Sequence, residues 1–147
     1  MQLTDHLMNS ITLLGGAAGA EPPERNSEDS VERQIVCAAR PALDAWHRRG
    51  LTDTVTIGTN EIPATFAVSI LTVEFLVHGW DYATATTHPI DVAESLADYV
   101  LGLAHKVITP QGRATVGFDD PVAVPDDAPP MDRLIAYTGR DPAAART

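Results

Sequence analysis

Cysteine is nearly absent from this chain, because Cys37 is the only one among 147 residues. One thiol cannot form a disulfide within the chain, and this usage is typical of a protein of the reducing cytoplasm. Aromatic residues are also scarce, at 5% of the chain. The core must therefore be built from the plentiful alanine, leucine and valine, which favours small and medium side chains packed between helices. We expect a cytoplasmic, helical protein.

Basic residues are the next shortage, with 10 lysines and arginines against 20 acidic residues and a formal net charge of −10. Such a charge repels phosphate backbones and anionic lipids, so we expect neither nucleic acid nor a membrane surface as a partner. No apolar run reaches the 18 or so residues that a membrane span requires. The apolar stretch 13–20 resembles a weak signal peptide, but Asp5 and the lack of lysine or arginine before it argue against secretion.

Helical periodicity dominates the pattern, and we expect residues 1–147 to form one all-α domain. Apolar spacing predicts helices over residues 3–14, 28–49, 64–86, 92–107 and 131–138. Short extended segments are predicted at 51–58 and, nearer the C-terminus, at 116–118 and 122–124.

Helix ends and interruptions are predicted from the residues that usually mark them. Gly15 and Gly16 should end the first helix, and Ser27 should cap the second. Pro41 should kink or split that second helix, and Pro63 should lie in the first turn of the third. In the fourth helix Asp91 is the expected cap, and an inner face is expected at Leu96, Tyr99, Val100 and Leu103.

The most informative stretch is Glu74-Phe75-Leu76-Val77-His78-Gly79-Trp80-Asp81, inside an apolar run. On a helix Glu74 and His78 lie one turn apart on one face, and Asp81 follows about one turn later. A carboxylate and an imidazole on an apolar helix form either a buried hydrogen-bonded pair or part of a metal site. The E-x-x-x-H spacing alone is common, and it does not choose between these two readings.

A metal site would need a third ligand from another helix, and His6 can supply it if the two helices pack together. His6 lies at the edge of the apolar stripe of the first predicted helix. Two histidines and one carboxylate leave an open coordination position. This is the ligand count of catalytic zinc sites and of non-haem ferrous sites. His47, His88 and His105 are weaker candidates, since each lies in a loop or near a helix end.

A resemblance to a known family points the same way. The block from Glu74 through His78-Gly79-Trp80-Asp81 resembles the signature of actinobacterial metal-binding proteins. These are similar to the metal-binding domain of mycothiol-dependent maleylpyruvate isomerase and to DinB-like four-helix bundles. The resemblance extends to Thr4-Asp5-His6-Leu7 and, in the C-terminal part, to residues 121–128, 132–134 and 139–142.

This resemblance implies a DinB-like helical bundle whose metal ligands are His6, Glu74 and His78. Zinc is the implied ion. The implied partners of the protein are a low-molecular-weight thiol similar to mycothiol and an electrophilic small molecule with which the thiol reacts. The activity would then be that of a thiol-dependent transferase or isomerase. Asp81 could accept the second ring N–H of a ligand histidine and fix its tautomer. The other reading of Asp81 is a surface carboxylate or one bonded to backbone.

The chain also departs from the family pattern. Family members carry a further helix some tens of residues before the first histidine, and here that histidine is His6. A bundle without that helix would leave an apolar groove, which a second copy could cover as a homodimer. The isomerase's separate C-terminal domain is also not recognisable. A non-catalytic helical interaction module and a truncated, inactive relative are therefore the alternatives to an enzyme.

Overall fold

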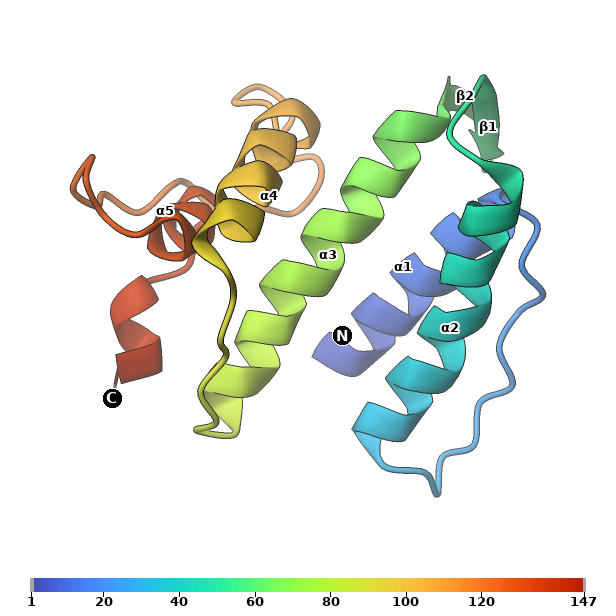
Figure 1. Ribbon diagram of the computed structural model, residues 1–147, viewed down its shortest axis with the longest axis horizontal. Helices are drawn as coiled ribbons and strands as arrows, with labels where there is room; N and C mark the ends of the chain where they lie inside the picture. The colour runs from blue at the N-terminus through green and yellow to red at the C-terminus, as the bar shows by residue number, and fades with distance from the viewer. Residues whose placement is uncertain (1, 147) are drawn as a thin grey trace. The chain divides into compact units, whose positions relative to one another are not determined.

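The computed structural model describes residues 2–146, and within them the chain is mainly helical with one small two-stranded sheet. The predicted helical class is confirmed. The chain divides into two compact units, Met1–Glu74 and Phe75–Thr147. The boundary falls inside one long helix, α3 (Ala64–Ala85), which continues through both units without a break (Figure 1).

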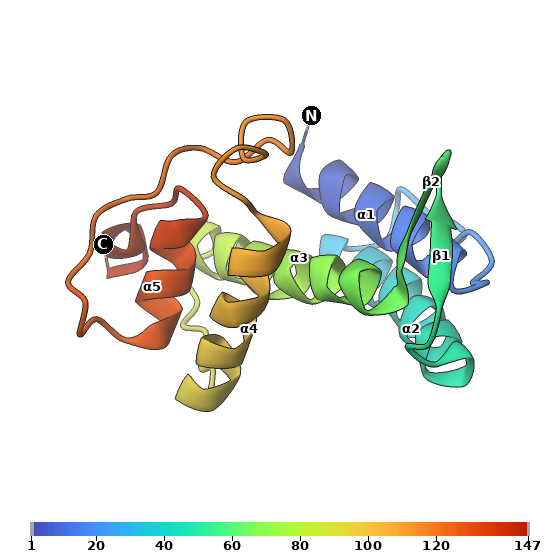
Figure 2. The ribbon, with the colours of Figure 1, turned by 90° about the horizontal axis from the view of Figure 1, so that it is seen from above.

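The first unit contains two helices, a β-hairpin and the beginning of α3. Its elements are α1 (Leu3–Ala17), α2 (Val31–Arg49), β1 (Thr54–Ile57) and β2 (Asn60–Pro63). Helix α1 lies along α2, as both ribbon views show (Figures 1 and 2). Leu7, Ile11 and Leu14 are buried as the helical spacing predicts, and the Trp46 indole donates a hydrogen bond to the Leu14 carbonyl at 3.0 Å. This contact fixes the C-terminal part of α1 against α2.

Helix α1 does not end at Gly15-Gly16 but continues to Ala17, so that prediction is wrong. Gly15 is instead the point of closest approach to α2. A Cβ atom at Gly15 would lie 2.6 Å from the Cβ of Ala42 and 3.2 Å from its Cα. Glycine is needed at this position because the backbones of α1 and α2 come close together there. It does not end the helix.

Replacing Gly15 by alanine should therefore destabilise the protein, although alanine is the better helix former. Overpacking at such a contact costs about 1–3 kcal/mol, and the gain in helix propensity returns only about 0.5–1 kcal/mol. We expect a net loss of roughly 1–2 kcal/mol in the free energy of unfolding, measured by urea denaturation followed by circular dichroism.

The matched control is Gly102→Ala in α4 (Glu94–Val107). Gly102 is an exposed helical glycine, and a Cβ there meets nothing within 4 Å. This change should stabilise the protein by about 0.5–1 kcal/mol. Equal effects of the two substitutions would show that the contact between Gly15 and Ala42 is not tight in solution.

Helix α2 begins later than predicted. Its N-cap is Ser30, whose side chain accepts a hydrogen bond from the Arg33 amide at 3.2 Å, and Ser27 lies before the helix. Pro41 lies inside α2 without splitting it. Gly50 ends the helix with φ +77°, a conformation that glycine adopts at little cost.

A β-hairpin follows α2 where only one extended segment was predicted. Strand β1 confirms the extended segment, and β2 pairs with it antiparallel, from Ile57 opposite Asn60 to Thr54 opposite Pro63. Pro63 is thus the last residue of a strand rather than part of a helix. Gly58, with φ +62°, supplies the positive φ that such a two-residue turn needs.

The second unit consists of the rest of α3, α4, α5 (Pro130–Tyr137) and a short 3-10 helix (Pro142–Arg146). Helix α4 packs against α5. Val100 and Leu103 are buried as predicted, but Leu96 and Tyr99 are 50% and 63% exposed. The inner face instead includes the buried residues Ala97, Leu101 and Ala104, so the predicted face was rotated from the true one. Ala93, not Asp91, is the N-cap.

The extended segments predicted near the C-terminus are not strands. Residues 110–117 form turns, and residues 118–125 form irregular chain. Pieces of three residues offer few backbone pairs, and here they bond to neighbouring groups instead. The Val122 amide, for example, donates to the Ala136 carbonyl of α5 at 2.9 Å.

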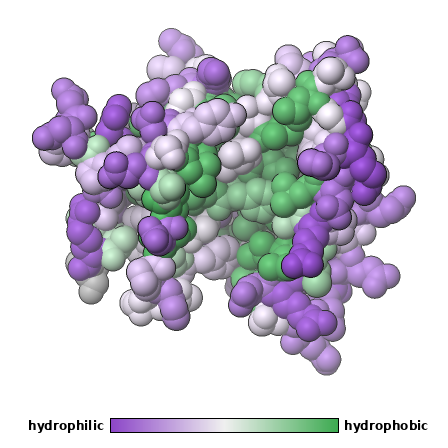
Figure 3. Space-filling view, in the orientation of Figure 1, coloured by the Kyte–Doolittle hydropathy of each residue, from purple (hydrophilic) through white to green (hydrophobic). Residues whose placement is uncertain are grey.

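Within the described residues, no helix combines the length and apolar character needed to cross a bilayer. Figure 3 shows polar side chains over much of the visible face, with apolar side chains reaching the surface in places. Among the described residues of the first unit, Val36 and Leu43 of α2 and Phe66 of α3 have exposed large apolar side chains.

Candidate metal centre

The candidate site is built on the middle of α3. Glu74 is the last residue of the first unit, and His78 follows it one turn later in the second. Because α3 is one continuous helix, the spacing of these two residues is set by the helix itself. Both are buried, at 8% and 6% exposure. The sequence thus places a carboxylate and an imidazole where apolar side chains are usual.

Within the first unit, helix α1 supplies two polar contacts to Glu74. The His6 Nε2 lies 3.0 Å from Glu74 Oε2, and the Ser10 hydroxyl donates to the same oxygen at 3.1 Å. His6 and Ser10 are themselves one turn apart on α1, at the edge of its buried stripe. These contacts satisfy a carboxylate whose burial would otherwise be costly.

His6, Glu74 and His78 each offer a ligand atom, and these three atoms lie within 4.8 Å of one another. The His6 side chain remains 45% exposed. The structure therefore brings together the three residues selected from the sequence, as a possible metal-binding group.

Within the second unit, His78 is held by Asp81. The Asp81 Oδ2 lies 2.8 Å from the His78 Nδ1. Arg140 approaches the same carboxylate with two nitrogens, Nε at 2.7 Å from Oδ1 and Nη2 at 2.9 Å from Oδ2. Asp81 thus contacts His78, the histidine expected to be a ligand, and the guanidinium behind Asp81 was not predicted.

The environment of Asp81 favours its charged form. Burial by itself raises the pKa of this carboxyl, but the hydrogen bonds from His78 and Arg140, together with the Arg140 charge, lower the pKa below its usual range. An ionised carboxylate can only accept hydrogen bonds. The His78 Nδ1 is therefore the donor, and in the neutral imidazole the lone pair lies on Nε2.

Two residues of this arrangement were missed at the sequence level. Ser10 carried a usable signal, because it lies four residues after His6 and so shares its helix face. Arg140 carried no local signal, because 59 residues separate it from Asp81. It entered the sequence analysis only as part of the segment 139–142 that resembles the family.

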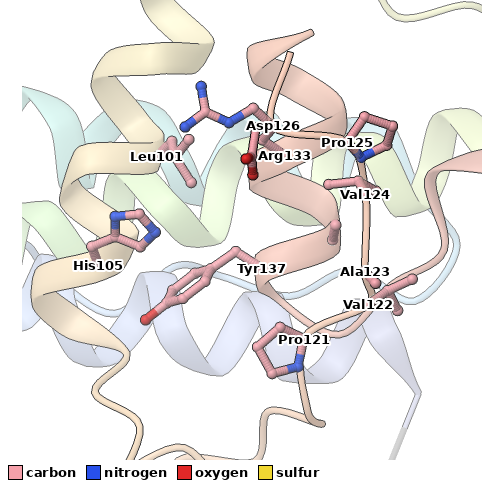
Figure 4. A pocket seen from close by; sticks show the side chains of 11 residues that line it. Leu101, His105, Pro121, Val122, Ala123, Val124, Pro125, Asp126, Arg133 and Tyr137 are labelled. Carbon is pink, nitrogen blue, oxygen red and sulfur yellow. The ribbon is translucent and has the colours of Figure 1, made fainter. Parts of the chain in front are cut away.

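The weaker histidine candidates lie apart from this group. His47 is an exposed residue of α2, and the His88 ring contacts the Thr86 carbonyl. His105 of α4 packs edge-on against Tyr137 of α5, with ring centroids 4.3 Å apart. Both rings line an open cavity of about 250 Å³ between α4, α5 and the chain 121–126 (Figure 4). None of the three candidate ligands lines this cavity.

Comparisons with known proteins add relatives but no activity. The chain is 29% identical over 141 residues to two uncharacterized proteins of Mycobacterium tuberculosis strains, MT0763 and Rv0738. The alignment covers 94% of this chain and 77% of each relative. No protein-family model matches the chain, and no solved structure matches it. The relatives' names state no ligand or reaction, so a function has to be argued from the site.

Proposed function

We propose that this protein binds one divalent metal ion through His6, Glu74 and His78. The observation that carries the proposal is the convergence of three ligand atoms within 4.8 Å around a buried carboxylate. The donor set fits the group: two imidazoles and one carboxylate are ligands that zinc accepts, and Asp81 orients His78 as outer partners orient ligand histidines. Zinc is our first choice of ion.

The resemblance to DinB-like metal-binding proteins supports a further step, a thiol-dependent transferase or isomerase activity in the cytoplasm. Bound zinc would supply Lewis acidity, which favours the thiolate form of a coordinated thiol at neutral pH. The protein's own part is to leave one coordination position open and to keep it reachable beside the half-exposed His6. Its strongly acidic charge would disfavour anionic substrates, so a neutral electrophile suits it best.

Metal analysis of the purified protein tests the binding proposal. We expect close to one zinc ion per chain by inductively coupled plasma mass spectrometry, after dialysis against metal-free buffer. A content far below one ion per chain, unchanged by incubation with zinc, iron(II), cobalt or manganese and a second dialysis, would refute it.

Thiol consumption tests the enzymatic step separately. The metal-loaded protein is incubated with small thiols, mycothiol included, and a broad panel of uncharged electrophiles, and adduct formation is followed by mass spectrometry. Metal-dependent turnover is expected. Stoichiometric metal without any turnover would instead favour the non-catalytic interaction module, for which Val36, Leu43 and Phe66 are exposed apolar residues of the first unit.

A further inference from the structure

In the second unit, Arg140 makes a paired side-chain contact with Asp81, the carboxylate beside His78. Its Nε and Nη2 meet the two oxygens of Asp81 at 2.7 Å and 2.9 Å. Such a paired contact fixes the plane of a carboxylate as well as its position. Both side chains are mostly buried, with 25% and 17% of their surface exposed, so solvent screens the pair less than a surface pair.

The carboxylate that Arg140 holds is the one that orients His78. Asp81 Oδ2 accepts from both Arg140 Nη2 and His78 Nδ1, at 2.9 Å and 2.8 Å. A carboxylate held by one partner alone can rotate about its last side-chain bond, which is broad and easily turned. With Arg140 on both oxygens this rotation would break two charged hydrogen bonds. The imidazole is thereby kept with Nδ1–H toward Asp81, and Nε2 is then the nitrogen that would bind the ion.

Arg140 is itself held in place by the turn that ends α5. The Arg140 amide donates to the Ile135 carbonyl at 3.2 Å, and the Gly139 amide donates to Ala136 at 3.0 Å. Gly139 has φ +87°, and a Cβ there would lie 2.8 Å from the Cβ of Asp119 and 3.0 Å from its carbonyl oxygen. Only glycine fits at this position. The backbone that carries Arg140 is therefore held by the hydrogen bonds of the turn and by its close contact with Asp119.

We propose that Arg140 is a positioning residue of the metal site. It holds Asp81 so that His78 presents Nε2 to the ion, and the C-terminal turn after α5 thereby sets the metal affinity. The inference rests on the proposed function, because His78 has to be a ligand for the affinity to change. If the ion pair between Arg140 and Asp81 were merely structural, its loss would alter folding stability. It would leave the zinc affinity of the folded protein and the His78 tautomer unchanged.

The test compares Arg140→Gln and Arg140→Lys with the wild-type protein. Zinc affinity is measured on folded protein by competition with a chromophoric chelator. Loss of the direct partner of a ligand histidine costs about 10–100-fold in affinity. Arg140→Gln leaves Asp81 in place, so we expect a loss at the lower end of this range, about 10-fold. Arg140→Lys keeps the charge but not the paired geometry, and it should lose less.

The matched control is Arg146→Gln, which removes the Arg146–Asp132 ion pair of 3.0 Å in the same unit. It should leave zinc affinity within about twofold of wild type, since it breaks no contact to the proposed site. Wild-type affinity in both folded Arg140 variants would overturn the inference. If Arg140→Gln does not fold, Arg140→Lys decides by the same criterion.

A second readout needs no metal and so separates this inference from the proposed function. In the metal-free protein, nitrogen-15 spectra of the imidazoles report which ring nitrogen of His78 carries the proton. Wild type should show the proton on Nδ1, and the Arg140 variants should show a mixture of tautomers. A protein that binds no metal but shows this change would refute the proposed metal function while keeping the positioning role. An unchanged tautomer would refute the positioning role.

Discussion

Replacing Glu74 by glutamine or His78 by alanine is expected to weaken zinc binding by more than about 100-fold. Loss of an outer partner alone costs about 10–100-fold, and removal of a ligand should cost more. Glutamine keeps the shape of Glu74 and can still bond to His6 and Ser10, which now meet its carboxylate at 3.0 Å and 3.1 Å. The change therefore tests the charge of the ligand with little loss of packing.

The same loss should be visible as a loss of thermal stabilisation by zinc. An ion present at 100 times its dissociation constant stabilises the wild-type protein by about 2.7 kcal/mol, and a 100-fold weaker variant gains only about 0.4 kcal/mol. For a chain of this size the wild-type gain corresponds to roughly 5–12 °C in melting temperature. Thermal melts with and without zinc, followed by circular dichroism, measure the difference.

His47→Ala is the matched control for these ligand variants. His47 is an exposed histidine of α2 and contributes no atom to the candidate group. The His47→Ala variant should retain the wild-type zinc affinity and the full thermal shift on zinc binding. If Glu74→Gln and His78→Ala also retained them, the bound metal would have to lie elsewhere, and the ligand assignment would be wrong.

Replacing Arg113 by methionine is expected to destabilise the protein by about 2–4 kcal/mol, because charge-assisted hydrogen bonds contribute about 1.5–3 kcal/mol each. Arg113 is a buried cation with 5% exposure. Its Nη1 donates to the carbonyls of Asp119 and Tyr137 at 2.8 Å and 2.7 Å, and its guanidinium lies 4.6 Å from the Tyr137 ring centroid. Methionine fills much of the same space but leaves both carbonyls without this donor.

Urea denaturation followed by circular dichroism measures the loss at Arg113. Arg48→Met, at an exposed position of α2, is the control and should change the free energy of unfolding by no more than about 0.5 kcal/mol. Arg113→Lys should fall between wild type and Arg113→Met, because one ammonium cannot reproduce the fork of a guanidinium. A loss below about 0.5 kcal/mol in the free energy of unfolding for Arg113→Met would contradict this prediction. It would show that solvent replaces the hydrogen bonds to the Asp119 and Tyr137 carbonyls as readily as at an exposed site.

The predictions that succeeded depend on local spacing. Glu74 and His78 were expected on one helix face, and α3 places them there because four residues make about one helical turn. The buried positions Leu7, Ile11 and Leu14 of α1 followed from the same period. Asp81 was found beside His78 for the same reason, three residues further along the helix.

The predictions that failed concern positions where packing overrides a local preference. Gly15-Gly16 was expected to stop a helix, yet Ala42 of α2 lies so close to Gly15 that only glycine fits inside α1. Leu96 and Tyr99 were expected inside, but α4 turns its face of Ala97, Leu101 and Ala104 inward. Large side chains do not by themselves determine which face is buried when small residues allow helices to approach more closely.

The amino-acid sequence by itself determined the helical class, the chemistry of His6, Glu74 and His78, and the one-turn spacing of the last two. These follow from short-range periodicity, which is encoded within a few residues. Only the tertiary structure decided that Ser10 and His6 meet Glu74 across 64 and 68 residues, and that Arg140 holds Asp81 across 59. Such contacts depend on how side chains of distant segments fill space together, and no local pattern in the chain specifies that.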